Sequence, residues 1–209
     1  MPLAVGGFVP FSTVDWPGHL TAVVFCQGCP WQCRYCHNTH LQLFHLPSPP
    51  NSTWPDLLEI FARRRGLLDG VVFSGGEATA QPGLLRALHE VQAMGFRTGL
   101  HTAGMFPLRF ARHLPHLDWV GLDIKAPFDH RYDAVTGRPD SASTVSQSLR
   151  LLLESGVDYE LRTTMHPQLL DESAREAIRR QLADFGAKPT RWQDFRPEGC
   201  FDDDLLATT

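Results

Sequence analysis

The stretch TAVVFCQGCPWQCRYCHN, residues 21–38, joins a short apolar run directly to a dense group of cysteines. Its first five residues are β-branched and aromatic apart from one alanine, which is typical of a buried strand. Four of the five cysteines of the chain lie within the eleven residues from Cys26 to Cys36. A disulfide framework would spread its cysteines along the chain. The crowding therefore indicates a metal site in a reducing compartment.

Outward from this stretch, strand-like and helix-like patterns alternate. We expect strands at residues 21–25, 70–73, 97–101, 119–124, 159–164 and 191–195, and helices at residues 55–65, 82–94, 107–114, 144–155 and 171–185. Parallel neighbours need a connection of helix length, so the alternation predicts an α/β fold with a parallel sheet. An open partial (β/α)6 barrel and a doubly wound sheet both fit the pattern. Either fold puts its chemistry at the C-terminal ends of the strands.

Length and charge narrow the class of protein. A chain of 209 residues fits a single domain, residues 1–209, with an N-terminal segment at 1–20, a cysteine-bearing loop at 26–54 and a C-terminal tail at 197–209. Its formal charge of −4 argues against nucleic-acid binding. The sequence holds no apolar run of the roughly 20 residues that a membrane span needs. We therefore expect a cytoplasmic protein that contacts no membrane.

Three of the cysteines have spacing suited to an iron–sulfur cluster. Cys29, Cys33 and Cys36 can ligate one face of a [4Fe–4S] cluster, and three ligands leave one iron open to an exogenous group. Cys26 ends the apolar run and is expected to be a buried small hydrophobe, although as a fourth ligand it would make the protein an electron carrier. For Cys200 we expect a structural or incidental role.

The CxxxCxxC spacing with Tyr35 before its last cysteine resembles the radical S-adenosylmethionine superfamily. The longer segment STVDWPGHLTAVVFCQGCPWQCRYCHN, residues 12–38, resembles the activating enzymes of glycyl radical enzymes, and most closely the activating proteins of anaerobic ribonucleoside-triphosphate reductase. The resemblance implies a partial (β/α)6 barrel, a [4Fe–4S] cluster and S-adenosylmethionine as cofactors. It also implies a glycyl radical enzyme as partner and a flavodoxin- or ferredoxin-type electron donor.

Polar residues at the ends of the expected strands are the candidates for binding S-adenosylmethionine. Asp123 and Lys125 lie two apart in a strand, so they share a face and can converge on one ligand. The resemblance implies that the Ser-Gly-Gly-Glu motif, residues 74–77, holds the amino group of the methionine moiety. It also implies that Lys125 meets the methionine carboxylate and that a monovalent cation can lie beside it. The full set of candidates is Tyr35, Ser74, Gly75, Gly76, Glu77, His101, Thr102, Asp123, Lys125, Arg162 and Arg196.

The activity that the resemblance implies is reductive cleavage of S-adenosylmethionine to a 5′-deoxyadenosyl radical, which installs a glycyl radical on the partner. The short tail after the last strand favours an open catalytic face that admits a protein loop. A radical enzyme that acts on a small molecule or peptide shares all of these motifs and remains an alternative. A non-catalytic iron–sulfur carrier, with Cys26 as the fourth ligand, is a second alternative.

Overall fold

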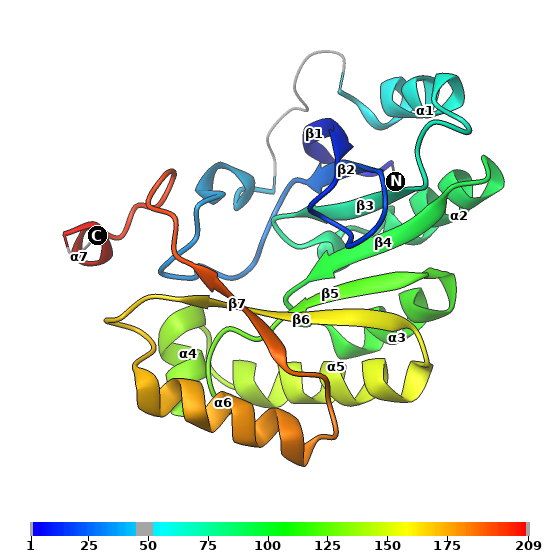
Figure 1. The fold of residues 1–209 in the computed structure, drawn as a ribbon. Helices are drawn as coiled ribbons and strands as arrows, with labels where there is room; N and C mark the ends of the chain where they lie inside the picture. The colour runs from blue at the N-terminus through cyan, green and yellow to red at the C-terminus, as the bar shows by residue number, and fades with distance from the viewer. Residues whose placement is uncertain (1, 45–51, 208–209) are drawn as a thin grey trace.

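The computed structural model describes residues 2–44 and 52–207, and its centre is one seven-stranded sheet (Figure 1). Strands β2 to β7 run parallel, and β1 pairs with β2 in the antiparallel direction. The strands are β1 (Val5–Ser12), β2 (Thr21–Cys26), β3 (Gly70–Gly75), β4 (Arg97–Thr102), β5 (Trp119–Asp123), β6 (Asp158–Met165) and β7 (Thr190–Asp194).

Helices connect the parallel strands. They are α1 (Trp54–Arg63), α2 (Leu84–Ala93), α3 (Pro107–His113), α4 (His130–Thr136), α5 (Ser141–Ser155), α6 (Glu172–Asp184) and α7 (Asp203–Leu206), with short 3-10 turns η1 (Thr39–Leu41), η2 (Ala78–Ala80) and η3 (Leu114–His116). Capping residues near in sequence define the ends of several helices. A capping box between Thr53 and Asp56 starts α1, and Gly156, at φ 73°, ends α5 in the left-handed conformation.

The strand order decides between the two folds that the sequence allowed. Neighbours in the sheet follow the chain order from β1 to β7 without a reversal. A doubly wound sheet reverses its order at a switch point, where helices pass to the other face. The sheet is therefore a partial barrel of six parallel strands with an added antiparallel edge strand, and the doubly wound alternative is wrong.

The two faces of the sheet pack differently. The outer face carries Val24, Phe73, Leu100 and Leu122, which form one large core with the buried sides of the helices. On the inner face a small cluster of Trp16, Val23, Val72 and Trp119 lies apart from that core. The rest of the inner face is free to carry polar side chains.

Several elements were not expected from the sequence. The N-terminal segment 1–20 contains strand β1, residues 126–140 contain α4, and the tail contains α7. Helix α5 begins at Ser141 rather than at residue 144, because Asp133 accepts hydrogen bonds from the Ser141 amide and hydroxyl and so extends the first turn. The cysteine-bearing loop contains η1, and residues 45–51 of that loop lie outside the described residues. No helix of the described ranges has the length and apolar character needed to cross a membrane.

Candidate active site

The candidate residues gather at the C-terminal ends of the parallel strands, as expected. The cysteine-bearing loop leaves β2 at this edge, the Ser-Gly-Gly-Glu motif leaves β3, and Asp123 and Arg162 are cross-strand partners on β5 and β6. Parallel strands bring these positions together because all their carboxyl ends meet at one edge of the sheet.

Cys29, Cys33 and Cys36 lie on the loop after β2 as free, partly exposed thiols. The loop is tied back on itself, since the Cys29 amide donates to the Gln42 carbonyl (3.0 Å) and the Cys36 amide donates to the Cys33 carbonyl (3.0 Å). Cys26, in contrast, is fully buried in the core on the helical side of the sheet. The expectation that Cys26 is a buried hydrophobe is confirmed, and its place in the core leaves the other three thiols as the accessible set.

Burial favours the neutral form of two of the three thiols, Cys29 and Cys33, by raising their pKa values. Burial raises the pKa of Cys29 to about 12, and the negative charge of Glu77 adds to the effect. Burial also raises the pKa of Cys33, against the opposing charge of Lys125. Within residues 2–44 and 52–207, no three His, Cys, Asp or Glu side chains converge on a single metal ion. A [4Fe–4S] cluster needs no such convergence, because each thiolate binds a different iron. Three free thiols on one loop fit a cluster of this kind.

The glycines of the Ser-Gly-Gly-Glu motif allow the cysteine-bearing loop to approach β3 closely. A Cβ at Gly76 would lie 2.5 Å from the Gly28 carbonyl oxygen, and one at Gly75 would lie 2.3 Å from the Cys26 nitrogen. Gly75 also has a φ of 112°, which L-residues rarely adopt. The amides that follow donate to the loop, Gly76 to the Cys26 carbonyl (3.0 Å) and Glu77 to the Gly28 carbonyl (2.9 Å). The motif thus fixes the start of the cysteine-bearing loop.

Glu77 is a buried carboxylate whose partners all lie within the chain. It is 1% exposed. It accepts hydrogen bonds from the Thr79 amide (3.0 Å) and hydroxyl (2.5 Å), the Thr102 hydroxyl (2.7 Å) and the Ala103 amide (2.9 Å). Four donors satisfy both oxygens. The geometry gives Glu77 a role in joining the ends of β3 and β4.

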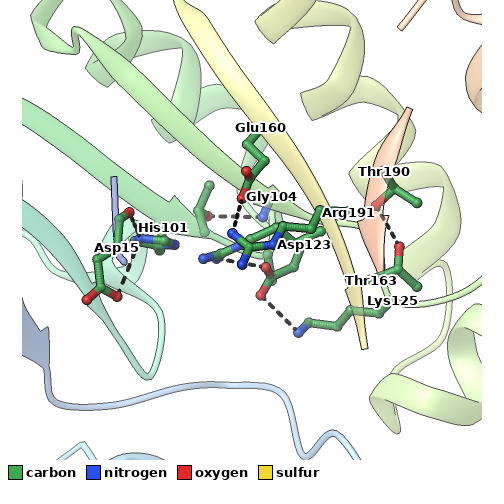
Figure 2. A network of polar contacts seen from close by, with 12 residues as sticks. Asp15, His101, Gly104, Asp123, Lys125, Glu160, Thr163, Thr190 and Arg191 are labelled. Atoms are coloured by element: carbon green, nitrogen blue, oxygen red, sulfur yellow. Dashed lines mark hydrogen bonds and ion pairs between the residues drawn. The ribbon is translucent and has the colours of Figure 1, made fainter. Parts of the chain in front are cut away.

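Asp123, Lys125 and Arg162 form a half-buried charged group. The Asp123 carboxylate lies 2.9 Å from Arg162 Nη2 and 3.4 Å from Lys125 Nζ, and Figure 2 shows Lys125 pointing at it. Burial acts to raise the pKa of Asp123, but the positive charges of Arg162 and Lys125 outweigh it and hold that pKa below its usual range. Two cations lie against one anion, and the buried Nε of Arg162 has no hydrogen-bond partner among residues 2–44 and 52–207. The group therefore fits an incoming carboxylate.

The residues expected around a monovalent cation contact one another in the structure. His101 Nε2 donates to the Asp15 carbonyl at 2.7 Å (Figure 2). Burial and the nearby Arg162 charge lower the pKa of His101 to about 3. Thr102 is bound to Glu77. Asp123 already contacts two cationic side chains. These contacts already engage the side chains expected around the cation, and the Asp15 carboxylate lies 3.9 Å from His101 Nε2.

The other candidates lie around the same edge. Tyr35 is buried, with Lys125 Nζ 5.5 Å from its ring centre. Ser74 is partly buried near the end of β3. Arg196 is exposed after β7 and acts electrostatically on His37 of the cysteine-bearing loop.

Two residues that the sequence did not single out position the site. The Tyr132 hydroxyl of α4 accepts from the Lys125 amide (3.1 Å) and donates to the Asp123 carbonyl (3.3 Å). Trp16 fills the opposite end of the inner face and stacks on Trp119 at 5.6 Å. Phe128, Tyr132 and Val135 recur at helical spacing. The helix is too short for this spacing to stand out in the sequence.

Comparison with known proteins identifies the family. The Radical SAM superfamily model matches residues 23–180. The chain belongs to the radical S-adenosylmethionine superfamily. A pyruvate formate-lyase-activating enzyme of Clostridium pasteurianum is 34% identical over 172 residues, which cover 80% of this chain and 69% of that enzyme. A protein of Methanocaldococcus jannaschii, provisionally named a glycyl-radical enzyme activating enzyme, is 29% identical over 98% of this chain and 85% of its own length.

Within the superfamily, this radical S-adenosylmethionine enzyme thus groups with the activating enzymes of glycyl radical enzymes. The structure of QueE from Escherichia coli has the same fold, with a TM-score of 0.58 and 18% identity over 99% of this chain and 90% of that one. Membership implies a [4Fe–4S] cluster and S-adenosylmethionine as cofactors. The thiol set and the positive charged group described above fit both.

Proposed function

We propose that this enzyme cleaves S-adenosylmethionine at a [4Fe–4S] cluster ligated by Cys29, Cys33 and Cys36, and that it activates a glycyl radical enzyme. The observation that carries the proposal is the meeting of three free thiols and the Asp123, Lys125 and Arg162 group at one edge of the sheet. The relatives named as activating enzymes support the reaction class.

When bound, the cluster supplies one electron to the sulfonium of S-adenosylmethionine, which yields methionine and a 5′-deoxyadenosyl radical. The protein residues place this cofactor. Lys125 and Arg162 attract the methionine carboxylate, and Asp123 holds both cations in position. Tyr35 packs beneath Lys125 and limits its motion.

We propose anaerobic ribonucleoside-triphosphate reductase as the partner and a flavodoxin- or ferredoxin-type protein as the electron donor. The hydrogen atom on the α-carbon of a partner glycine moves to the 5′ carbon, which leaves 5′-deoxyadenosine and a glycyl radical. The resemblance of residues 12–38 to that activating family supports this partner. Five free cysteines support a reducing, cytoplasmic location.

The ligand assignment is tested by iron analysis after anaerobic reconstitution. The wild-type protein should hold about four irons per chain, and replacement of Cys29, Cys33 or Cys36 by alanine should remove the cluster. The Cys26→Ala and Cys200→Ala proteins are the matched controls and should retain it. Loss of the cluster from Cys26→Ala with retention in Cys29→Ala would overturn this ligand assignment.

The partner is tested by electron paramagnetic resonance. Reduced enzyme with S-adenosylmethionine and an anaerobic ribonucleotide reductase should give a doublet organic radical, which a glycine-to-alanine change near the partner's C-terminus removes. A doublet on a pyruvate formate-lyase and none on the reductase would show that the partner is the lyase and not the reductase. Transfer of deuterium from a small metabolite into 5′-deoxyadenosine would favour the small-molecule alternative.

A further inference from the structure

The C-terminal tail, residues 197–207, packs on the cysteine-bearing loop. The Arg34 guanidinium, between Cys33 and Cys36, contacts Asp202 through Nε at 2.6 Å and through Nη2 at 3.1 Å. The Cys200 thiol donates to the Arg34 carbonyl at 3.3 Å. The Thr39 hydroxyl donates to the Gly199 carbonyl at 3.0 Å. Both the side chain and the carbonyl of Arg34 are therefore held by the tail.

Gly199 allows this close packing. Its φ is 78°, and a Cβ there would lie 2.2 Å from the His37 carbonyl oxygen. The backbone of the tail and that of the loop are thus in direct contact at the residue after Cys36. A side chain at position 199 would force the two segments apart.

Asp202 links this contact to the rest of the tail. Besides binding Arg34, it caps α7 by accepting from the Leu205 amide at 3.2 Å. Its side chain is 17% exposed, against 85% for Asp204, which lies 3.7 Å from the same guanidinium. A bidentate, half-buried pair is stronger than an exposed single contact. Asp202 is therefore the main anchor and Asp204 a peripheral neighbour.

The tail also binds the other side of the barrel. Leu205 is fully buried in the main core, and its carbonyl lies 3.2 Å from Nε2 of His166, the residue that follows β6. The first and last parallel strands of this partial barrel do not pair with each other. In Figure 1 the tail leaves β7 and reaches the loop that follows β2. It thus bridges the strand ends that carry Arg162 and the loop that carries the thiols.

We propose that the tail positions the cluster-binding loop through the Asp202–Arg34 pair, so that Asp202 is a positioning residue for the cluster. The inference rests on the proposed ligation by Cys29, Cys33 and Cys36. Holding Arg34 fixes the backbone between two of the three ligands and sets their distance from Lys125 and Arg162. Release of the pair leaves all three thiols present but less constrained.

The test compares Asp202→Asn with Asp204→Asn as the matched control, and with Asp202→Glu as the conservative variant. In the protein without a cluster, iodoacetamide should alkylate Cys33 and Cys36 about five-fold faster in Asp202→Asn than in Asp204→Asn, because the loop opens more often. After reconstitution, Asp202→Asn should keep its iron. The midpoint potential of its cluster should shift, and cleavage of S-adenosylmethionine should fall about five-fold.

Recovery of the wild-type potential and labelling rate by Asp202→Glu supports the proposal. Equal labelling rates and potentials in Asp202→Asn and Asp204→Asn overturn it. If Asp202→Asn does not fold, Arg34→Gln decides, since it removes the same pair from the side of the loop. Faster labelling than in Asp204→Asn supports the proposal, and equal labelling overturns it. Alkylation needs no cluster, so a wild-type protein that binds no iron refutes the proposed function while the positioning role is still measured.

Discussion

At the scale of the residue, Glu77 shows how a buried side chain of a motif can bond within the protein. The carboxylate lies next to the cysteine-bearing loop, where the resemblance implies a ligand for the methionine amino group. Its four donors from Thr79, Thr102 and Ala103 instead make it the junction between two strand ends. The carboxylate therefore joins two strand ends, and its contact with the methionine amino group stays a prediction.

We expect Glu77→Gln to destabilise the protein by about 2–4 kcal/mol, because the amide brings a donor to a site where every partner is already a donor. Urea unfolding of the protein without its cluster measures the change. Glu59→Gln, at an exposed pair with Arg63, is the control and should change stability by less than about 0.5 kcal/mol. Equal stability of the two variants would contradict the structural role of Glu77.

Asp123 provides a second prediction, since Arg162 and Lys125 already neutralise it. We expect the affinity for S-adenosylmethionine and the thermal midpoint to be the same in potassium, sodium and choline chloride at equal ionic strength. Ion binding to the native state would raise the thermal midpoint in a saturable way. Such a rise with potassium or sodium and not with choline would show that an ion occupies the site.

At the scale of the element, the segment between β1 and β2 closes the N-terminal end of the inner face. Trp16 is 2% exposed and stacks on Trp119. A Cβ at Gly99 would lie 2.9 Å from the Trp16 ring. The indole thus occupies space that glycines on β3 and β4 leave open, and it holds the Asp15 carbonyl against His101.

Trp16→Ala should cost about 3–5 kcal/mol of unfolding free energy, since it empties this space. Trp16→Phe should cost less because it keeps an aromatic ring against Trp119. Chemical denaturation measures both variants against Val14→Ala, a change at a residue that is 75% exposed and should be nearly neutral. A Trp16→Ala protein as stable as Val14→Ala would show that the segment contributes little to the fold.

At the scale of the whole molecule, two buried histidines make stability depend on pH. Burial and the Arg162 charge lower the pKa of His101 to about 3. Burial, together with His116, Arg109 and Arg112, lowers the pKa of His113 to about 4. In the unfolded chain both return to about 6.5. The unfolded state therefore binds more protons below pH 6.5, and stability is full above that pH and is lost as pH falls toward 4 and 3.

We expect the unfolding free energy to fall by about 2 kcal/mol between pH 7 and pH 5.5, since each histidine contributes up to about 1.4 kcal/mol per pH unit. His101→Gln and His113→Gln should each remove about half of this slope, and the double variant most of it. Denaturation curves at several pH values measure the slope. An unchanged slope in the double variant would assign the pH dependence to other groups.

The sequence by itself determined the parallel sheet, the edge at which the chemistry lies and the buried state of Cys26. These features depend on local information: the period of apolar residues, glycine and proline at helix ends, and cysteine spacing within one loop. The family resemblance rests on the same local motifs, and the superfamily match over residues 23–180 confirms it. The edge strand β1 and the short helix α4 were not predicted. Few residues define each of them, and both depend on contacts with distant parts of the chain.

Only the tertiary structure decided between the two sheet topologies and showed which charged side chains pair. Asp123 and Arg162 are 39 residues apart in sequence, and Arg34 and Asp202 are 168 apart. Their pairing depends on strand register and on the path of the tail, which no local pattern encodes. The partners of Glu77 and the anchoring of the cysteine-bearing loop follow from such long-range contacts, because a side chain's role is set by the partners that folding brings to it.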